Sequence, residues 1–259
     1  MKKLENKVSI ITGAGSGMGK AIAILFAEHG SLVVGSDINQ SSLDNLEKEI
    51  KQAGGQITTV LANVAKEEDI EKMFKLALDI YGTVDVLVNN AGVMDDFNGA
   101  GEMSVEMWER TMNININGPF KTTRKAIQIM LNSGKGGVIV NNASIAGFAG
   151  AVAGAAYTAS KHALIGLTQN TGFMYAKRGI RCNAIAPGAV NTNIAHTSGF
   201  TTDNVSDLVK NVILPAQALT NPRTAEPEEI AQVALFLASS DSSFVNGAVV
   251  TADGGWTAM

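Results

Sequence analysis

The stretch VSIITGAGSGMGKAIAILFAEHG, residues 8 to 30, decides the fold of this chain. It begins with a β-branched apolar run, VSIIT (8 to 12), which is typical of a buried strand, and ends with a helical pattern over 17 to 29. A glycine-rich turn joins the two. This order predicts the opening half of a βαβ unit, in which backbone N–H groups at the helix N-terminus can bind a phosphate.

Strand and helix patterns alternate along the rest of the chain. The further strand candidates are residues 31 to 36, 56 to 62, 84 to 89, 137 to 143, 180 to 186 and 247 to 252. The further helical segments are residues 41 to 53, 66 to 81, about 104 to 132, 157 to 178 and 227 to 239, with Ser41, Ser104 and Pro227 as predicted starts. This alternation predicts a single α/β domain over residues 1 to 259: a Rossmann-like, doubly wound, seven-stranded parallel sheet flanked by helices. The one long irregular segment, rich in Thr, Asn and Pro, is expected to form a substrate lid at about 189 to 226.

The composition argues against several classes of protein. A formal charge of −4 with no long run of like charge gives no reason to expect a nucleic-acid partner. The single cysteine, Cys182, lies in an apolar strand candidate, which predicts a buried thiol and a reducing compartment. No signal peptide or membrane-spanning run is present, so we expect a cytoplasmic protein with no membrane partner. The three histidines are scattered, and no cluster has the spacing of a metal site.

The turn TGAGSGMG (12 to 19) carries its glycines at an unusual spacing. A G-x-G-x-x-G pattern from Gly13 would need a glycine where Met18 stands, and the chain has T-G-x-x-x-G-x-G instead, with Gly13, Gly17 and Gly19. The two patterns meet similar physical demands: a positive φ at the turn, close approach of the backbone to a phosphate, and room for the helix to pack on the sheet. Asp37 ends the second strand, where an acid can bond the ribose hydroxyls of NAD and repel the 2′-phosphate of NADP. We therefore predict NAD as the cofactor, with a simple turn before the next helix as the alternative role of Asp37.

Tyr157 and Lys161 stand four positions apart in AAYTASKHAL (155 to 164). On a helix this spacing puts both side chains on one face, one turn apart, so that each affects the charge of the other. Taken alone, the pair also fits an exposed helix with a solvated lysine.

With these features in place, the chain resembles, over nearly its full length, the short soluble branch of the short-chain dehydrogenase/reductase family. The matching stretches are TGAGSGMG (12 to 19), NNAG (89 to 92), NINGPF (115 to 120), NNASIAG (141 to 147), YTASK (157 to 161), PGAVNT (187 to 192) and DGG (253 to 255). Independently of the family, the polar motifs follow successive predicted strands. They should therefore meet at the carboxyl edge of the sheet, where ligands bind in open α/β folds.

The resemblance implies roles for four catalytic residues. Tyr157 is the general acid/base, and Ser144 bonds the substrate oxygen. Lys161 bonds the nicotinamide ribose, and Asn115, picked among three asparagines by its place before Gly118, holds a water that links Lys161 to solvent. The same resemblance implies a cofactor site formed by Gly13, Ser16, Gly17, Met18, Gly19, Asp37, Asn63, Val64, Asn90, Ala91, Gly92, Tyr157, Lys161, Pro187, Gly188, Val190 and Thr192.

The chemistry of carbonyl reduction explains these residue types. A carbonyl that accepts hydride becomes an alkoxide and needs a proton donor whose pKa is nearer neutrality than the value of about 10 of a free phenol. We expect the positive charges of Lys161 and of the oxidised nicotinamide to lower the pKa of Tyr157. Ser144 would supply a preorganised hydrogen bond to the oxyanion.

Two positions depart from the family pattern. Asn63 stands where an aspartate is usual, and its amide oxygen could still accept from the adenine amino group. Met174 stands where many relatives have a glutamate, on a helix that packs against a neighbouring subunit in the family. On the resemblance alone, we expect a homotetramer.

The sequence therefore predicts an NAD-dependent oxidoreductase that interconverts a secondary alcohol and a ketone. The closest alternative is a 3-oxoacyl-thioester reductase of fatty-acid synthesis, which would favour NADPH and basic residues. A non-catalytic NAD-binding module is the alternative from another class. The expected substrate walls, residues 93 to 101, 143 to 154 and the lid, are largely apolar, which favours a neutral or hydrophobic small molecule.

Four residues beyond the motifs are left with open or modest roles. Asp95 and Asp96 follow NNAG on the same rim, and we expect them in a solvated loop. His196 falls in the lid, where it could touch substrate. Trp256, after DGG, could line a pocket or an oligomer contact.

Overall fold

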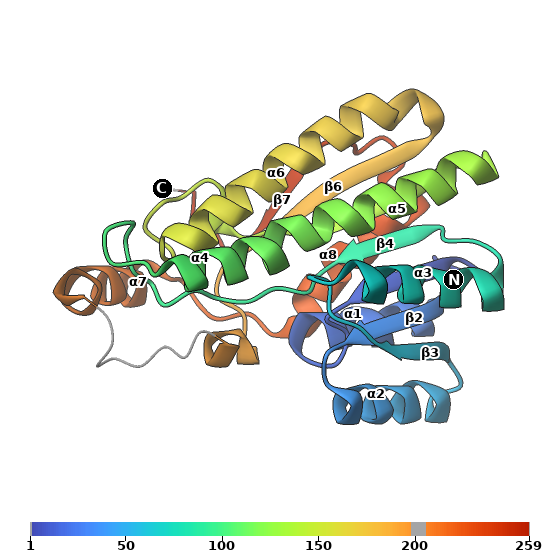
Figure 1. Ribbon diagram of the computed structural model, residues 1–259, viewed down its shortest axis with the longest axis horizontal. Coiled ribbons are helices and arrows are strands. Elements are labelled where there is room, and N and C mark those ends of the chain that lie inside the picture. The colour runs from blue at the N-terminus through green and yellow to red at the C-terminus, as the bar shows by residue number, and fades with distance from the viewer. Residues whose placement is uncertain (1, 198–205, 259) are drawn as a thin grey trace.

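The seven predicted strands form one parallel sheet in the computed structural model, which describes residues 2–197 and 206–258 (Figure 1). The strands are β1 Val8–Thr12, β2 Leu32–Asp37, β3 Gln56–Leu61, β4 Val86–Asn89, β5 Gly137–Asn142, β6 Ile180–Pro187 and β7 Val249–Ala252. Their order is β3-β2-β1-β4-β5-β6-β7, and every pairing is parallel. The predicted doubly wound sheet is confirmed, and its order reverses between β1 and β4.

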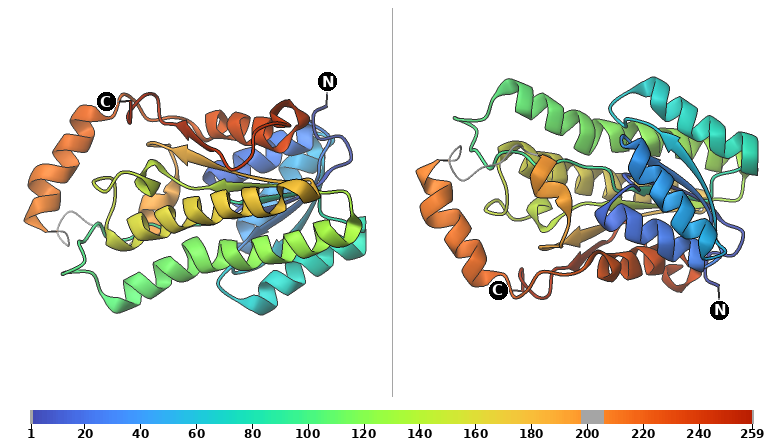
Figure 2. Two further views of the ribbon diagram at one scale, coloured as in Figure 1. Left: turned by 90° about the horizontal axis from the view of Figure 1, so that it is seen from above. Right: turned by 90° about the horizontal axis from the view of Figure 1, so that it is seen from below.

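Helices cover both faces of the sheet (Figure 2). One face carries α1 Gly17–Glu28, α2 Gln40–Gln52 and α8 Pro227–Ala238, whose apolar sides share one core cluster. The other face carries α3 Glu67–Tyr81, α5 Gly118–Ser133 and α6 Ala155–Tyr175. The short helix α4 Val105–Met112 precedes α5. Because β1 and β4 send their helices to opposite faces, a crevice opens between them at the carboxyl edge of the sheet.

Helix starts were only partly predictable. Ser104 caps α4 through a hydrogen bond from the Met107 N–H, and Pro227 is the first residue of α8, as expected. The predicted start at Ser41 is wrong. The cap of α2 is Asn39, whose side chain accepts from the Ser42 N–H, because asparagine satisfies free N–H groups in the first turn as well as serine does.

A π-helical turn interrupts the predicted helix over 104 to 132. Residues Asn113–Asn117 form this turn, between the end of α4 and the start of α5. A π turn holds one residue more than an α turn, so it changes which side chain points inward, and such turns are common at functional sites. Here Asn115 is buried, while Asn113 and Asn117 are exposed.

The described parts of the predicted lid fold as two pieces. A 3₁₀ turn, Asn193–Thr197, follows β6, and a π turn, Val209–Ile213, leads into α7 Leu214–Thr220. In Figure 2, α7 stands at one end of the molecule, away from the sheet. Residues 198–205 and the side chain of His196 lie outside the described residues. Among those described, no helix combines the length and apolar character needed to cross a membrane.

Candidate active site

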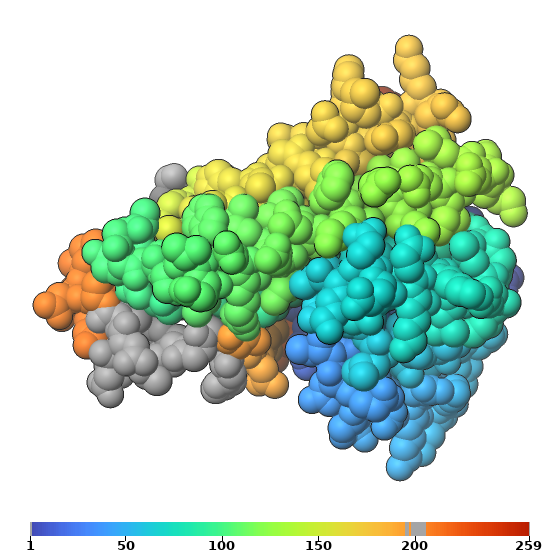
Figure 3. Space-filling view, in the orientation of Figure 1, coloured from blue at the N-terminus to red at the C-terminus, as the bar shows by residue number. Residues whose placement is uncertain are grey.

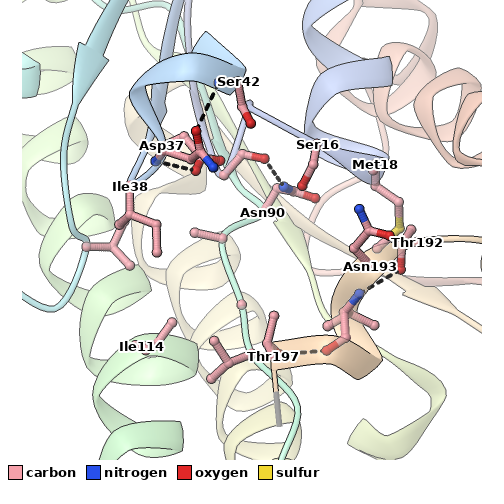
Figure 4. A pocket seen from close by; sticks show the side chains of 18 of the residues that line it. Ser16, Met18, Asp37, Ile38, Ser42, Asn90, Ile114, Thr192, Asn193 and Thr197 are labelled. Atoms are coloured by element: carbon pink, nitrogen blue, oxygen red, sulfur yellow. Dashed lines mark hydrogen bonds between the residues drawn. The ribbon is translucent and has the colours of Figure 1, made fainter. Parts of the chain in front are cut away.

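A cleft of about 400 Å³ lies at the carboxyl edge of the sheet (Figure 4). Segments that follow β1, β2, β3, β4 and β6 meet there, as the placement of the motifs predicted. The residues that line it are Gly13, Ser16, Gly17, Met18, Asp37, Ile38, Asn39, Ser42, Ala62, Asn63, Val64, Asn90, Ala91, Gly92, Val93, Ile114, Thr192, Asn193, Ile194 and Thr197. Its size and mixed lining suit a small organic ligand or cofactor.

The glycine turn is packed so closely that side chains could not replace its hydrogens. A Cβ on Gly19 would lie 2.0 Å from the carbonyl oxygen of Gly13, and one on Gly13 would lie 2.9 Å from the Cα of Ala91. Gly13 and Gly17 also have positive φ values of 66° and 50°. The turn therefore brings bare backbone to the cleft at the start of α1, where the helix dipole favours a phosphate group.

Asp37 lines the cleft at the end of β2 and is already held by backbone donors. Its Oδ2 accepts from the Gly15 N–H at 2.9 Å, and its Oδ1 accepts from the Asn39 N–H at 3.0 Å. Next to it, Ile38 is 74% exposed, so its apolar side chain offers a surface to a ligand (Figure 4). Carboxylate lone pairs remain for the hydroxyl groups of a ribose.

A hydrogen-bond chain connects the glycine turn to strand β5. The Asn90 side chain donates to the carbonyl oxygens of Thr12 and Gly13, at 3.0 and 3.2 Å. Its own amide oxygen accepts from the Asn142 side chain at 2.8 Å. Asn142 was not predicted as a site residue, and only its position two residues before Ser144 could have indicated it.

Ser144, Tyr157 and Lys161 gather beside Gly92, one of the residues that line the cleft. All three are buried, and the Lys161 Nζ lies 5.3 Å from the centre of the Tyr157 ring. Lys161 also donates to the carbonyl oxygen of Asn142 at 2.9 Å. A Cβ on Gly92 would lie 3.8 Å from the Lys161 Nζ, which places that ammonium group next to the cleft wall.

Burial dominates the acid–base properties of this group in the protein without cofactor. Burial raises the pKa of Tyr157 to about 12, although a hydrogen bond from Ser144 lowers it, and the charge of Asp95 raises it further. Burial also lowers the pKa of Lys161 to about 8. In the protein without cofactor, burial is thus the main influence on the pKa of the phenol. The lowering expected from Lys161 together with the oxidised nicotinamide concerns the cofactor-bound enzyme and stays a prediction.

Asn115 is clamped between the NNAG segment and α6. Its amide oxygen accepts from the Val93 N–H at 2.9 Å, and its amide nitrogen donates to the Val93 carbonyl oxygen at 2.9 Å. The same nitrogen donates to the Ser160 hydroxyl at 3.3 Å. A Cβ on Gly92 would lie 3.4 Å from the Asn115 Oδ1, so this amide lies behind the same wall as Lys161.

The structure brings most of the predicted cofactor residues together, and it adds others. Six of the predicted residues lie outside the cleft lining: Gly19, Tyr157, Lys161, Pro187, Gly188 and Val190. Of these, Gly19 and Gly188 are packed tightly against the turn and Asp253. The amide oxygen of Asn63 already accepts from the Ala65 N–H at 2.9 Å. The cleft residues that sequence reasoning missed are Ile38, Asn39, Ser42, Ala62, Val93, Ile114, Asn193, Ile194 and Thr197.

The remaining chemical candidates are structural. Cys182 is a buried strand thiol, as predicted, and burial raises its pKa to about 12. Trp256 donates to the Thr220 hydroxyl at 3.0 Å and so joins the C-terminal segment to α7. Within residues 2–197 and 206–258, no group of three His, Cys, Asp or Glu side chains could hold a metal ion.

Comparison with known proteins agrees with the fold and the motifs. Residues 13–257 match the family model described as Enoyl-(Acyl carrier protein) reductase. The chain is 41% identical to 3beta-hydroxysteroid dehydrogenase 2 of Eggerthella lenta, over 98% of this chain and 96% of that protein. It is 38% identical to the 3-oxoacyl-[acyl-carrier-protein] reductase of Thermotoga maritima, over 98% of each. The crystal structure of levodione reductase superposes with a TM-score of 0.88 at 31% identity, covering 98% of this chain and 99% of that one.

A doubly wound sheet with a glycine turn, a carboxyl-edge cleft and a buried Ser, Tyr and Lys defines a nucleotide-dependent oxidoreductase. The chain belongs to the short-chain dehydrogenase/reductase family, whose members use a nicotinamide cofactor, NAD or NADP.

Proposed function

We propose that this protein is an NAD-dependent oxidoreductase that interconverts a secondary alcohol and a ketone. The observation that carries the proposal is the burial of Ser144, Tyr157 and Lys161 beside Gly92, which lines the same cleft as Asp37. A cleft with a reaction centre beside it and a carboxylate in its lining suits a dinucleotide. The tight glycine turn that lines the same cleft leaves room for phosphate groups and none for side chains.

In this proposal, Tyr157 moves the proton of the reaction. When bound, NAD supplies the nicotinamide ring that accepts or donates the hydride. As the phenolate, Tyr157 takes the hydroxyl proton during alcohol oxidation, and as the phenol it returns that proton to the ketone oxygen during reduction. Because Ser144 is hydrogen-bonded to Tyr157, both hydroxyl groups can reach the same substrate oxygen, and Ser144 stabilises the charge that develops there.

Lys161 and Asn115 support that proton transfer. Lys161 is buried near the ring, so its positive charge favours the phenolate in surroundings of low dielectric. Asn115 fixes the Val93 backbone beside Gly92, and so holds the cleft-lining segment that lies next to Lys161. A water held by Asn115 would give Lys161 a route to exchange protons with solvent.

Asp37 supports the choice of NAD over NADP. Its carboxylate faces the cleft at the end of β2, where a second phosphate on the ribose would meet a like charge. The neighbouring segment, Ser36 to Gln40, contains no Lys or Arg that could compensate. The 2′-hydroxyl of NAD can instead donate to the carboxylate.

The substrate is proposed to be a neutral, largely apolar molecule. The expected wall from 143 to 154 consists mainly of Ala, Gly and other apolar residues, and α7 is held against it by two hydrogen bonds from Gln217 to the carbonyl oxygens of Ala151 and Val152. A protein named as a hydroxysteroid dehydrogenase is among the relatives, so steroids belong in the first panel of substrates.

The deciding experiment measures nicotinamide absorbance with NAD and NADP on a panel of secondary alcohols and ketones. Wild-type protein is compared with Tyr157→Phe, which keeps the ring and removes the proton donor. Turnover with NAD that disappears in the variant supports the reaction, the cofactor and the role of Tyr157 together. Tight NAD binding without turnover on any panel member would favour a non-catalytic NAD-binding module.

A 3-oxoacyl-thioester reductase is the second candidate, and the Thermotoga maritima relative is the observation that favours it. Such an enzyme would reduce a 3-oxoacyl thioester with NADPH. A kcat/KM with NADPH and a 3-oxoacyl thioester that exceeds the value with NAD and any secondary alcohol would put this candidate first.

A further inference from the structure

Asp95 lies buried in the loop after β4, contrary to the solvated position expected from the sequence. Its fractional exposure is 0%, whereas the adjacent Asp96 is partly exposed. Asp95 lines no part of the cleft and takes no part in the proposed chemistry. A buried carboxylate is costly unless its oxygens are hydrogen-bonded, so its partners indicate what it does.

The partners of Asp95 are backbone N–H groups at the start of the catalytic helix. Its Oδ2 accepts from the Tyr157 N–H at 2.7 Å, and its Oδ1 accepts from the Gly154 N–H at 3.0 Å. The Oδ1 also accepts from the Phe97 N–H at 3.2 Å, which closes a turn within the loop. The N-cap of α6 is Gly154, which has no side chain to serve as a cap. Asp95 therefore caps α6 from a distant part of the sequence.

The helix start is shaped to receive this carboxylate. A Cβ on Gly154 would lie 2.6 Å from the Asp95 Oδ2, so a glycine is needed for the close approach. The neighbouring Ala155 N–H donates to the carbonyl oxygen of Asn98 at 2.9 Å. Three of the first four N–H groups from Gly154 to Tyr157 are thus bonded by the loop Asp95 to Asn98.

The same loop begins at the cleft. Gly92 and Val93 line the cleft, and Val93 is clamped by Asn115 on both its N–H and its carbonyl oxygen. Within the loop, Phe97 adopts a φ of 64°, a conformation that non-glycine residues rarely take. Such a conformation persists only where the surrounding structure fixes it. The loop is therefore a short, fully specified connection between the cleft wall and the helix that carries Tyr157.

We propose that Asp95 is a positioning residue for the reaction, which holds Tyr157 in place relative to the cleft by capping α6 and which sets the electrostatic surroundings of the phenol. The proposal rests on the proposed function, because it takes Tyr157 as the general acid/base. A carboxylate that binds the N–H of Tyr157 itself controls the register of that side chain along the helix. Small displacements of a reacting group reduce the rate strongly.

The charge of Asp95 affects the pKa of Tyr157, and this effect distinguishes the proposal from a purely structural role of Asp95 in packing. Ser144, Lys161 and Asp95 are the polar and charged groups that act on the phenol, and among them Asp95 raises the pKa of Tyr157. Removing its charge should lower that pKa, so that the phenolate forms at lower pH. In alcohol oxidation, the rise of kcat/KM with pH should then move to lower pH.

The test compares Asp95→Asn with Asp96→Asn, a matched control that removes the neighbouring charge in the same loop. We expect Asp95→Asn to lower kcat about tenfold or more, because its NH₂ group faces backbone donors in place of an oxygen. The KM for NAD should stay within about twofold of wild type, since Asp95 lies outside the cleft. The pH–rate limb should shift to lower pH in Asp95→Asn and stay in place in Asp96→Asn.

A second measurement does not depend on turnover. The ultraviolet absorbance of tyrosinate is titrated in wild type and Asp95→Asn, each after subtraction of its Tyr157→Phe counterpart, which isolates one of the three tyrosines. If wild type turns over no alcohol, the proposed function fails, while this titration still tests the effect of Asp95 on Tyr157. A titration and a pH–rate limb that match wild type would overturn the proposal, whatever the value of kcat.

Gly154→Ala tests the same contact from the helix side. The added methyl group would displace the carboxylate without removing it. If Asp95→Asn does not fold, this variant decides: a lowered kcat with a phenol titration shifted to lower pH supports the proposal. Wild-type kcat and titration in Gly154→Ala would overturn it.

Discussion

At the scale of single residues, Asp37 carries the discrimination between cofactors. We expect Asp37→Asn to reduce the ratio of kcat/KM for NAD over NADP by about tenfold or more, a change of about 1.4 kcal/mol. The amide keeps one oxygen for the Gly15 N–H but no longer repels a 2′-phosphate. Steady-state kinetics with both cofactors measures the ratio.

The control for that prediction is Asp44→Asn. This residue is exposed on α2, so the variant loses the same charge away from the cleft and should keep the wild-type ratio. An unchanged ratio in Asp37→Asn would contradict the proposed role of Asp37.

The buried charge of Lys161 should be visible in the stability of the ligand-free protein. Its folded pKa of about 8 lies below its usual value of 10.5, so below pH 8 the folded protein bears the cost of a buried ammonium group. Between about pH 8 and 10.5 the unfolded chain holds the extra proton, and the free energy of unfolding should rise with pH. Urea unfolding of wild type and Lys161→Met measures this change. The prediction is wrong if the difference in the free energy of unfolding between wild type and Lys161→Met stays constant over this pH range.

A property of a single residue could be predicted from the sequence only where neighbours along the chain determine it. The positions of Asp37 at a strand end and of Tyr157 and Lys161 on one helix were predictable from their spacing, whereas the roles proposed for them came from the family resemblance. The buried state of Asp95 and the raised pKa of Tyr157 were not predictable, because both depend on atoms that arrive from distant segments. The sequence shows which residues carry charge, but not which of them are buried.

At the scale of elements, the π turn Asn113–Asn117 determines which asparagine enters the site. We expect Asn115→Ala to lower kcat about tenfold or more and to reduce the free energy of unfolding by about 1–3 kcal/mol, since both polar groups of Val93 lose their partner. Enzyme assays and urea unfolding measure the two effects. Asn117→Ala is the matched control, because Asn117 lies exposed in the same turn. Equal losses of kcat and of unfolding free energy in the two variants would show that the Asn115 side chain has no specific role in the turn.

The same turn marks the limit of prediction from helical periodicity. The pattern over 104 to 132 correctly indicated helix on both sides, but a one-residue insertion into the hydrogen-bond ladder leaves almost no mark in a run such as TMNININGPF. The family resemblance selected Asn115, and the geometry gives a physical reason for that choice: the middle residue of the π turn is the buried one.

At the scale of the whole molecule, the sheet was predictable because parallel strands are buried on both faces and therefore form continuous apolar runs. The course of the segment after β6 was not. Its polar composition predicted a lid, but the contacts that place its described parts come from elsewhere: Thr197 accepts from the Met94 N–H at 3.0 Å, and Gln217 donates to the wall at Ala151. Such long-range polar contacts leave no periodic pattern.

The last prediction concerns the assembly, which we propose to be a homotetramer. The outer sides of α4, α5 and α6 form a broad face (Figure 3), and the large apolar side chains exposed on these helices include Trp108, Phe120, Phe173 and Met174. Phe173 and Met174 are 83% and 61% exposed, which is costly for an isolated chain and is explained if α6 packs against another copy.

Light scattering at micromolar concentration should therefore give four times the mass of one chain, and Phe173→Glu with Met174→Glu should give a smaller species, because two charges would be buried at the contact. Ile80→Glu, which changes an exposed apolar residue on α3, should leave the tetramer intact. A wild-type monomer would remove the proposed assembly. If the tetramer persists in the double variant, its interfaces do not include the end of α6.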